Sequence, residues 1–430
     1  PGAPTLKSKR QRVLIRPSLS EMAQVALLTA AATALPCLLG GVSYVGPEQP
    51  LRARWRGHPD APAPAGLTGT LEAFGATRAT IRDPQVPCLV IGSAQADGIG
   101  VRASFDGWTA AVLPVGDTPL AEHGNCAAAA VLAGSMAVSE IFQFFRGTQP
   151  LACHRRIGWS LWDPSLPWDA AAAGPALTVL PQSAWLVGLG NLGQAYLWTL
   201  GLLPYGADSC ELVLQDFDSV SLANRSTSLL SREVDVGRRK TRMTAGWAER
   251  RGFRTKIVER RFAADFTVAN DEPAVALMGV DSPAPRRIVE QVGFSRVIEA
   301  GLGHGPGDYL GITMHTFPAE RPALDCWMDP ANASGDVTAV RFNQAAYQHL
   351  LTDSGDRCGT LRLAGRSIAT PFTGAVAGAL VIGELLRICH GGARVEYTAL
   401  HLARPLESTI VAGVPWPVIN PGLIAPALPV

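Results

Sequence analysis

Glycines and acidic residues with the spacing of a nucleotide site lie between residues 183 and 218. The apolar run S-A-W-L-V passes into G-L-G-N-L-G, and the next such run, E-L-V-L-Q, ends in D-F-D. Glycines after a strand let the backbone approach phosphate, and an acid at the end of the next strand meets ribose hydroxyls. The candidate cofactor-binding residues are Gly188, Gly190, Asn191, Gly193, Asp216 and Asp218.

Three residues further along the chain favour ATP over a dinucleotide. Arg225 and Lys240 follow the acidic strand end, and cations suit a triphosphate, which carries more charge than a pyrophosphate. Asp281 follows the apolar run A-V-A-L-M-G-V, and a carboxylate at the carboxyl end of a parallel strand can meet magnesium-bound phosphate. A nicotinamide-dependent oxidoreductase on a Rossmann fold is the rival interpretation, but it does not explain Lys240 or Asp281.

The order of these motifs resembles that of the ThiF-like, ubiquitin-activating-enzyme superfamily over roughly residues 183–387. Members adenylate the C-terminal carboxylate of a ubiquitin-like protein, a sulfur carrier or a peptide. The resemblance implies that Asn224 and Lys240 contact phosphate and that Asp218 and Asp281 hold Mg²⁺. It also implies that Arg225, Lys240 and Asp281 stabilise charge during catalysis.

One position departs from the superfamily pattern. The superfamily usually places an arginine three residues after the asparagine, whereas Thr227 stands there and Arg225 directly follows Asn224. This shift keeps open a pseudo-enzyme scaffold that binds nucleotide or a partner without turnover. His304 and His315 are further catalytic candidates, although isolated histidines in loops and strands are usually structural.

The elements needed to hold this site predict an α/β fold with two Rossmann-like domains of the adenylation type. Residues 183–430 are predicted to form the active domain, because short apolar runs alternate there with helical patterns. Residues 1–152 are predicted to be an inactive, degenerate copy, with an unrelated α/β domain as the alternative. In this copy C-L-V-I-G-S, starting at Cys88, resembles the first strand of a nucleotide fold without its glycine spacing.

The stretch between the two domains, residues 153–182, is predicted to be a linker rich in Trp and Pro. In the superfamily a basic residue from outside the active half reaches the γ-phosphate. Arg155 or Arg156 could take that place, and a solvated linker charge is the plainer interpretation.

An acyl-accepting cysteine is predicted in a crossover segment around residues 331–370. Cys358 lies in a polar loop beside Arg357, and an adjacent cation favours the thiolate that acyl transfer needs. Cys326, in L-D-C-W, is the competitor, although the neighbouring tryptophan favours burial. The segment leads into a predicted helix, Pro371 to Arg387, whose Gly and Ala content suits close packing on the sheet.

Composition limits the classes of partner. A net charge of +1 does not suggest nucleic-acid binding, and eight cysteines without a C-x-x-C pair fit neither a zinc site nor a disulfide scaffold. We therefore expect reduced thiols in a cytoplasmic protein. The apolar stretch Glu21 to Gly41 follows a basic segment, but Glu21, Gln24 and Pro36 favour a buried helix over a signal peptide or membrane helix.

The resemblance as a whole implies an activating enzyme most similar to those of bacterial ubiquitin-like conjugation operons. Such an enzyme uses ATP and Mg²⁺ to adenylate the C-terminal carboxylate of a ubiquitin-like protein, captures it as a thioester and passes it to a conjugating enzyme. An adenylyltransferase for a sulfur carrier or peptide, without a thioester, also fits. The sequence names neither the carrier nor the conjugating partner, and it leaves a homodimer open.

Overall fold

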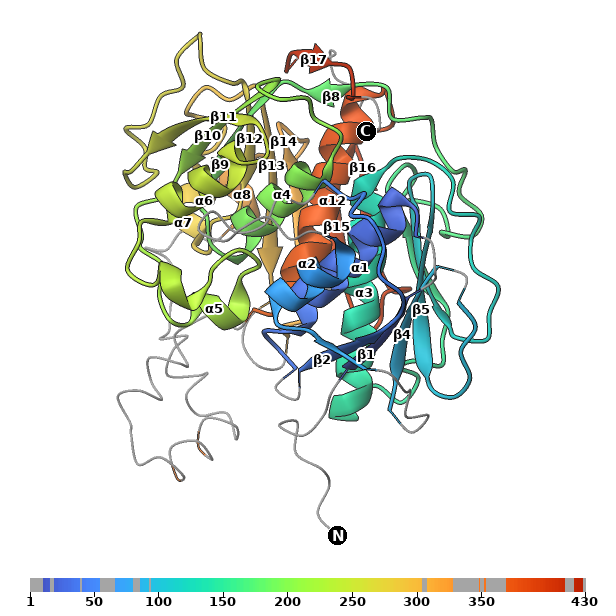
Figure 1. The fold of residues 1–430 in the computed structure, drawn as a ribbon. Coiled ribbons are helices and arrows are strands. Elements are labelled where there is room, and N and C mark those ends of the chain that lie inside the picture. The colour runs from blue at the N-terminus through green and yellow to red at the C-terminus, as the bar shows by residue number, and fades with distance from the viewer. Residues whose placement is uncertain are drawn as a thin grey trace.

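Two sheets with the same strand order form the framework of the chain (Figure 1). In this computed structural model the first sheet has the order β3-β2-β1-β4-β5-β6-β7, and the second has the order β11-β10-β9-β12-β13-β14-β15-β16. In each sheet the first five strands along the chain run parallel, and the later strands are antiparallel. The predicted α/β class is confirmed, with sheets rich in parallel pairs.

The structure describes most of the chain between residues 11 and 427. The described residues are 11–15, 19–38, 41–54, 66–79, 86–92, 94–303, 308–327, 348, 352, 369–413 and 421–427. Cys358, His304 and nearly all of the predicted crossover segment lie outside them.

The strands are short, as expected for buried parallel sheets. Those of the first sheet are β1 (Gln11–Ile15), β2 (Val42–Val45), β3 (Thr77–Arg78), β4 (Cys88–Ile91), β5 (Gly100–Asp106), β6 (Thr109–Pro114) and β7 (Ile157–Ser160). Those of the second sheet are β9 (Ser183–Val187), β10 (Cys210–Gln215), β11 (Phe253–Val258), β12 (Val275–Met278), β13 (Arg296–Leu302), β14 (Gly311–Phe317), β15 (Val395–His401) and β16 (Thr409–Ala412). A two-stranded ribbon pairs β8 (Leu180–Pro181) with β17 (Leu423–Ile424).

The helices follow the same succession in both halves. They are α1 (Glu21–Ala34), α2 (Leu67–Phe74), α3 (Ala127–Arg146), α4 (Asn191–Leu202), α5 (Asn224–Thr227), the 3₁₀ turn η2 (Glu233–Asp235), α6 (Lys240–Glu249), α7 (Pro283–Arg287), α8 (Ala323–Cys326) and α12 (Pro371–Cys389). Thus α1, α2 and α3 stand where α4, α6 and α12 stand in the second half. The helix predicted from Pro371 to Arg387 is confirmed as α12.

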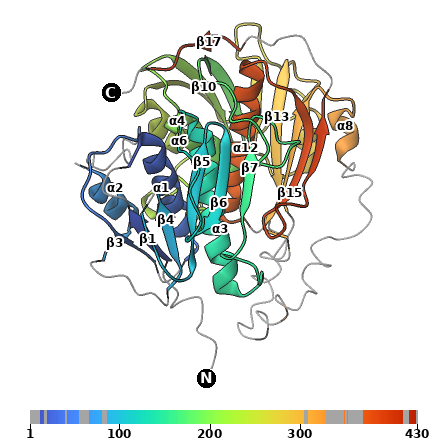
Figure 2. The ribbon, with the colours of Figure 1, turned by 90° about the vertical axis from the view of Figure 1, so that its right-hand side faces the viewer.

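Small residues let the central helices of the two halves pack closely. A Cβ on Gly134 of α3 would lie 2.4 Å from the carbonyl oxygen of Ala26 in α1, and a Cβ on Gly378 of α12 would lie 2.9 Å from that of Ala195 in α4. Figure 1 shows these helices between the two sheets, and the turned view in Figure 2 shows α12 beside α3. One continuous hydrophobic core therefore contains residues from both halves.

The first strand of the N-terminal half is β1, so the expectation for Cys88–Ile91 was wrong. That segment is the fourth strand, β4, which pairs with β1 and β5. The first strand was missed because polar residues surround its apolar core in R-Q-R-V-L-I, where Val13 is buried.

The apolar stretch that begins at Glu21 forms the buried helix α1, as predicted. Among the described residues, two helices, α3 and α12, are long and apolar enough to cross a membrane, and both are almost wholly buried inside the protein.

Candidate functional site

The glycine-rich loop joins β9 to an open helix end. Gly188 adopts φ +83°, and its amide donates to the carbonyl of Gln215 at 2.9 Å. A Cβ on Gly193 would lie 2.0 Å from the carbonyl oxygen of Gly188, so only glycine fits this approach. Gly190 precedes α4 without a side-chain cap, and a Cβ there would meet nothing within 4 Å. The free N–H groups of this helix end are therefore available to an anion.

Asp216, directly after β10, holds this loop in place through hydrogen bonds to backbone amides. It is buried, with one carboxylate oxygen accepting from the amide of Leu189 at 2.7 Å and the other from the amide of Asp218 at 2.8 Å. Both oxygens therefore hold backbone, and the Asp218 carboxylate beside it is half exposed.

Lys240 brings a cation to the same place. It is the first residue of α6, and its Nζ lies 3.0 Å from the carboxylate of Asp218 and 3.9 Å from that of Asp216. Its amide also donates to the carbonyl of Asp218 at 3.0 Å. The structure thus brings the glycine loop, two acids and a lysine together at the carboxyl ends of neighbouring parallel strands, where open α/β sheets bind ligands.

Asn224 and Arg225 are engaged within the segment between β10 and α6. The Oδ1 of Asn224 accepts from the amide and hydroxyl of Ser221 at 2.8 and 3.0 Å, and so closes a turn. Arg225 forms an exposed ion pair with Glu233 at 2.6 Å. Among the described residues, the amide NH₂ of Asn224 makes no hydrogen bond that competes with a phosphate contact, whereas one guanidinium nitrogen of Arg225 is held by Glu233.

Asn191 ties the loop to distant parts of the chain. Its Nδ2 donates to the carbonyl of Thr227 and, at 3.2 Å, to that of Thr370 just before α12. Thr227, which stands where the superfamily usually has arginine, thus meets the loop through its backbone. Asn191 connects the start of α4 to the helix that follows the crossover segment.

Asp281 lies exposed three residues after the end of β12. Arg286, a little further along the chain, belongs to a buried charge network that the sequence reasoning missed. Arg286 donates to the carbonyls of Val280, at 2.5 and 3.1 Å, and Ala300, at 3.1 Å, and pairs with Glu299 at 3.2 Å. Glu299 in turn meets Nδ1 of His315 at 2.5 Å. The signal was a glutamate inside the apolar run V-I-E-A, since a buried acid needs a partner.

The competing cysteine, Cys326, is partly buried at the end of α8. Burial raises the pKa of its thiol, and Arg321 offsets this only in part. The thiolate is therefore disfavoured at Cys326.

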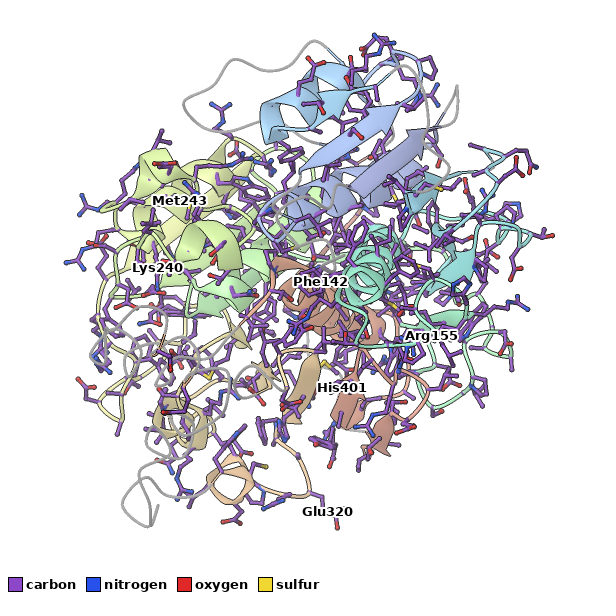
Figure 3. All side chains as sticks on the ribbon, turned by 90° about the horizontal axis from the view of Figure 1, so that it is seen from below. Phe142, Arg155, Lys240, Met243, Glu320 and His401 are labelled. Atoms are coloured by element: carbon purple, nitrogen blue, oxygen red, sulfur yellow. The ribbon has the colours of Figure 1, made fainter. Side chains whose placement is uncertain are left out.

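The linker arginines do not lie near this site. Arg155 forms a buried ion pair with Glu140 of α3 at 2.5 Å and donates to the carbonyl of Ala403 at 2.7 Å. Figure 3 shows Arg155 and Lys240 on opposite sides of the molecule. Arg156 pairs with Asp117 at 3.4 Å. Arg155 therefore joins the two halves instead of reaching toward the glycine loop.

Known proteins resemble the chain over most of its length. The family model of the BilD N-terminal domain matches residues 12–161, and that of the BilD C-terminal domain matches residues 180–392. The bacterial E1-like protein BilD of Collimonas sp. (strain OK412) is 38% identical over 389 residues, which are 87% of this chain and 81% of that protein.

Solved structures are similar over about half of the chain. Escherichia coli MccB covers 54% of this chain and 61% of its own, at 13% identity and a TM-score of 0.33. The E. coli tRNA N6-threonylcarbamoyladenosine dehydratase TcdA covers 49% of this chain and 86% of its own, at 16% identity and a TM-score of 0.31.

The matches to both BilD domain models and the 38% sequence identity with the Collimonas protein confirm the resemblance to ubiquitin-activating enzymes. The chain belongs to the BilD family of bacterial E1-like proteins.

Proposed function

We propose that the chain is an ATP-dependent activating enzyme that adenylates the C-terminal carboxylate of a ubiquitin-like protein. The observation that carries this proposal is the open N-terminus of α4 beside Asp216, Asp218 and Lys240. Helix amides and a lysine together suit the phosphates of ATP, and their charge stabilises the transition state of adenylation.

The residues around the glycine loop also fit Mg²⁺. This ion is usually held by one or two carboxylates together with substrate phosphates, so a cage of three protein ligands is not required. Asp218 is half exposed, and Asp281 is exposed at the end of the adjacent parallel strand β12. We assign these two carboxylates to the metal, which would supply charge neutralisation at the phosphates.

The N-terminal half carries counterparts of these features that do not suit a nucleotide. The amide of Leu19 donates to Oε1 of Gln49 at 2.7 Å, where in the second half the amide of Leu189 donates to Asp216 at the same distance. The N-terminus of α1 is capped by Ser20, whose hydroxyl accepts from the amide of Ala23 at 3.1 Å. In the N-terminal half the neutral Gln49 thus stands in place of the acid Asp216. The Ser20 hydroxyl caps the N-terminus of α1, so that helix end is not free to bind an anion.

A buried arginine on β5, Arg102, contacts the residues that directly follow β4, the strand that corresponds to β12. Arg102 donates to the carbonyls of Gly92, Ala94 and Val115, the latter two at 3.0 and 3.1 Å. Burial lowers its pKa. We therefore assign the inactive half to the first sheet, which ends at Ser160 instead of residue 152, and the active half to residues 183–430.

The proposed reaction has two stages. The carboxylate of the carrier attacks the α-phosphate of ATP, and pyrophosphate leaves. The thiolate of Cys358 then attacks the acyl-adenylate, AMP leaves, and the acyl group passes as a thioester to a conjugating enzyme. The guanidinium of Arg225 would contact these phosphates once its ion pair with Glu233 has broken.

ATP–pyrophosphate exchange with a candidate ubiquitin-like protein tests the first stage. We expect exchange that requires the intact C-terminus of the carrier and is lost in Asp281→Ala. A non-reducing gel then tests the second stage, in which Cys358→Ser should retain exchange but form no thioester, while Cys326→Ser behaves as wild type.

Each failure has a separate meaning. Exchange with an unaltered thioester in Cys358→Ser would remove the cysteine assignment alone. Magnesium-dependent ATP binding without exchange would favour a scaffold without turnover. Binding of NAD but not of ATP would favour the nicotinamide-dependent oxidoreductase.

A further inference from the structure

Gln194, in the first turns of α4, is a buried amide whose hydrogen-bonding groups are all engaged. Its Oε1 accepts from the amides of Leu230 and Ser231, each at 3.0 Å. Its Nε2 donates to the carbonyl of Leu189 at 3.1 Å and to the hydroxyl of Ser231 at 2.9 Å. Both hydrogens and both lone pairs of the side-chain amide are therefore used, so Gln194 holds these neighbours in one arrangement.

The bond to Leu189 orients one peptide group of the glycine loop. The peptide between Leu189 and Gly190 is planar and trans, so its N–H points away from the carbonyl that Gln194 holds. Gly190 is partly exposed, and its amide donates to no acceptor among the described residues. Because Gln194 is buried, it keeps the Gly190 N–H on the outer side of the loop.

The bonds to Leu230 and Ser231 attach a second segment to the same place. These two buried residues lie between α5, which carries Arg225, and η2. The position of Arg225 relative to the glycine loop therefore depends on this attachment. One side chain, that of Gln194, connects an amide donor and a guanidinium that are both candidates for contact with phosphate.

We propose that Gln194 is a positioning residue for the phosphates of ATP, acting through the Gly190 amide and through residues 229–231. This inference rests on the proposed function, because it takes the phosphates to lie at the start of α4. A phosphate oxygen accepts from the Gly190 N–H, and hydrogen bonds to a charged acceptor contribute more than neutral ones. Gln194 itself is fully buried and contacts no nucleotide.

The test combines nucleotide titration with the amide resonance of Gly190 in the full chain. The protein is labelled with isotope-enriched glycine, and the Gly190 signal is assigned as the one that disappears in Gly190→Ala. In wild type, Mg·ATP should shift this signal downfield, because the amide gains a bond to phosphate. Isothermal titration measures the affinity for ATP in the same samples.

Gln194→Met removes these hydrogen bonds at nearly constant side-chain length. The affinity for ATP should fall roughly 10- to 100-fold, the range for one lost hydrogen bond to a charged group, and the Gly190 signal should shift less at saturation. The matched control is Thr199→Val, which removes a buried hydrogen bond to the carbonyl of Ala195 at 3.0 Å on the same helix. Both readouts should match wild type in this control.

Gln194→Glu separates the two contacts, and it replaces Gln194→Met if that variant does not fold. Its carboxylate still accepts from the amides of Leu230 and Ser231, and these amides favour the ionised form. It cannot donate to the carbonyl of Leu189. Hydrogen–deuterium exchange at Leu230 and Ser231 should therefore stay slow, while the Gly190 signal loses its response to ATP.

Two results would overturn the proposal and leave the proposed function standing. One is wild type that binds ATP without a shift of the Gly190 signal. The other is a Gln194 variant, Met or Glu, in which both the affinity for ATP and the Gly190 shift equal those of wild type. Failure of wild type to bind ATP would instead overturn the proposed function itself.

Discussion

Asp216→Asn tests how the buried acid holds the glycine loop. The carboxylate accepts two amide hydrogens, from Leu189 at 2.7 Å and from Asp218 at 2.8 Å. An asparagine retains one acceptor oxygen, but its NH₂ group faces the other amide. The substitution therefore removes one charge-assisted hydrogen bond and leaves one buried N–H unsatisfied.

The size of the effect follows from that lost contact. Hydrogen bonds to charged groups contribute about 1.5–3 kcal/mol, so the loop should open roughly 10- to 100-fold more often. The affinity for ATP should fall at least as much, because the same turn positions Asp218 and, through it, Lys240.

Hydrogen–deuterium exchange of a peptide that spans Leu189 measures the opening, and isothermal titration measures ATP affinity. The matched control is Gln49→Ala, which removes the corresponding acceptor in the N-terminal half. It should speed exchange at Leu19 while ATP affinity stays unchanged. Exchange at Leu189 and ATP affinity equal to those of wild type in Asp216→Asn would refute the reasoning.

Three further changes test other parts of the structure. Gly193→Ala should destabilise by about 1–3 kcal/mol in urea unfolding, because its Cβ would lie 2.0 Å from the Gly188 carbonyl, whereas Gly190→Ala has open space and should cost far less. Arg155→Ala should cost about 3–5 kcal/mol by leaving Glu140 buried and unpaired, with ATP affinity unchanged and exposed Arg156→Ala near wild type. Burial lowers the pKa of His401 below its usual value of 6.5; the charge of Arg404 lowers this pKa further, and the charge of Asp308 raises it in part. The unfolded chain therefore binds more protons below about pH 6.5, so the Tm of wild type should fall on acidification by more than that of His401→Gln.

The site residues that the sequence revealed are those whose chemistry is local. The glycine loop, Asp216 and Lys240 stand at strand ends and helix starts, and the α/β topology brings such positions together. The helices α3 and α12 could also be predicted from the sequence, because a long apolar run with small residues favours a buried helix.

What the sequence could not show depends on contacts between distant segments. The partner of Arg155 is a glutamate on α3, and the partners of Asn191 are the carbonyls of Thr227 and Thr370. The repetition of the fold was visible only in part, because β1 carries polar residues and Gln49 replaces the acid that marks the second half.

Isothermal titration of Mg·ATP onto the full chain tests most directly whether the C-terminal half holds the nucleotide site. We predict one ATP per chain, with binding lost in Lys240→Met and retained in Arg242→Met, which removes an exposed cation from the same helix. Two ATP molecules per chain, or undiminished binding in Lys240→Met, would contradict the account.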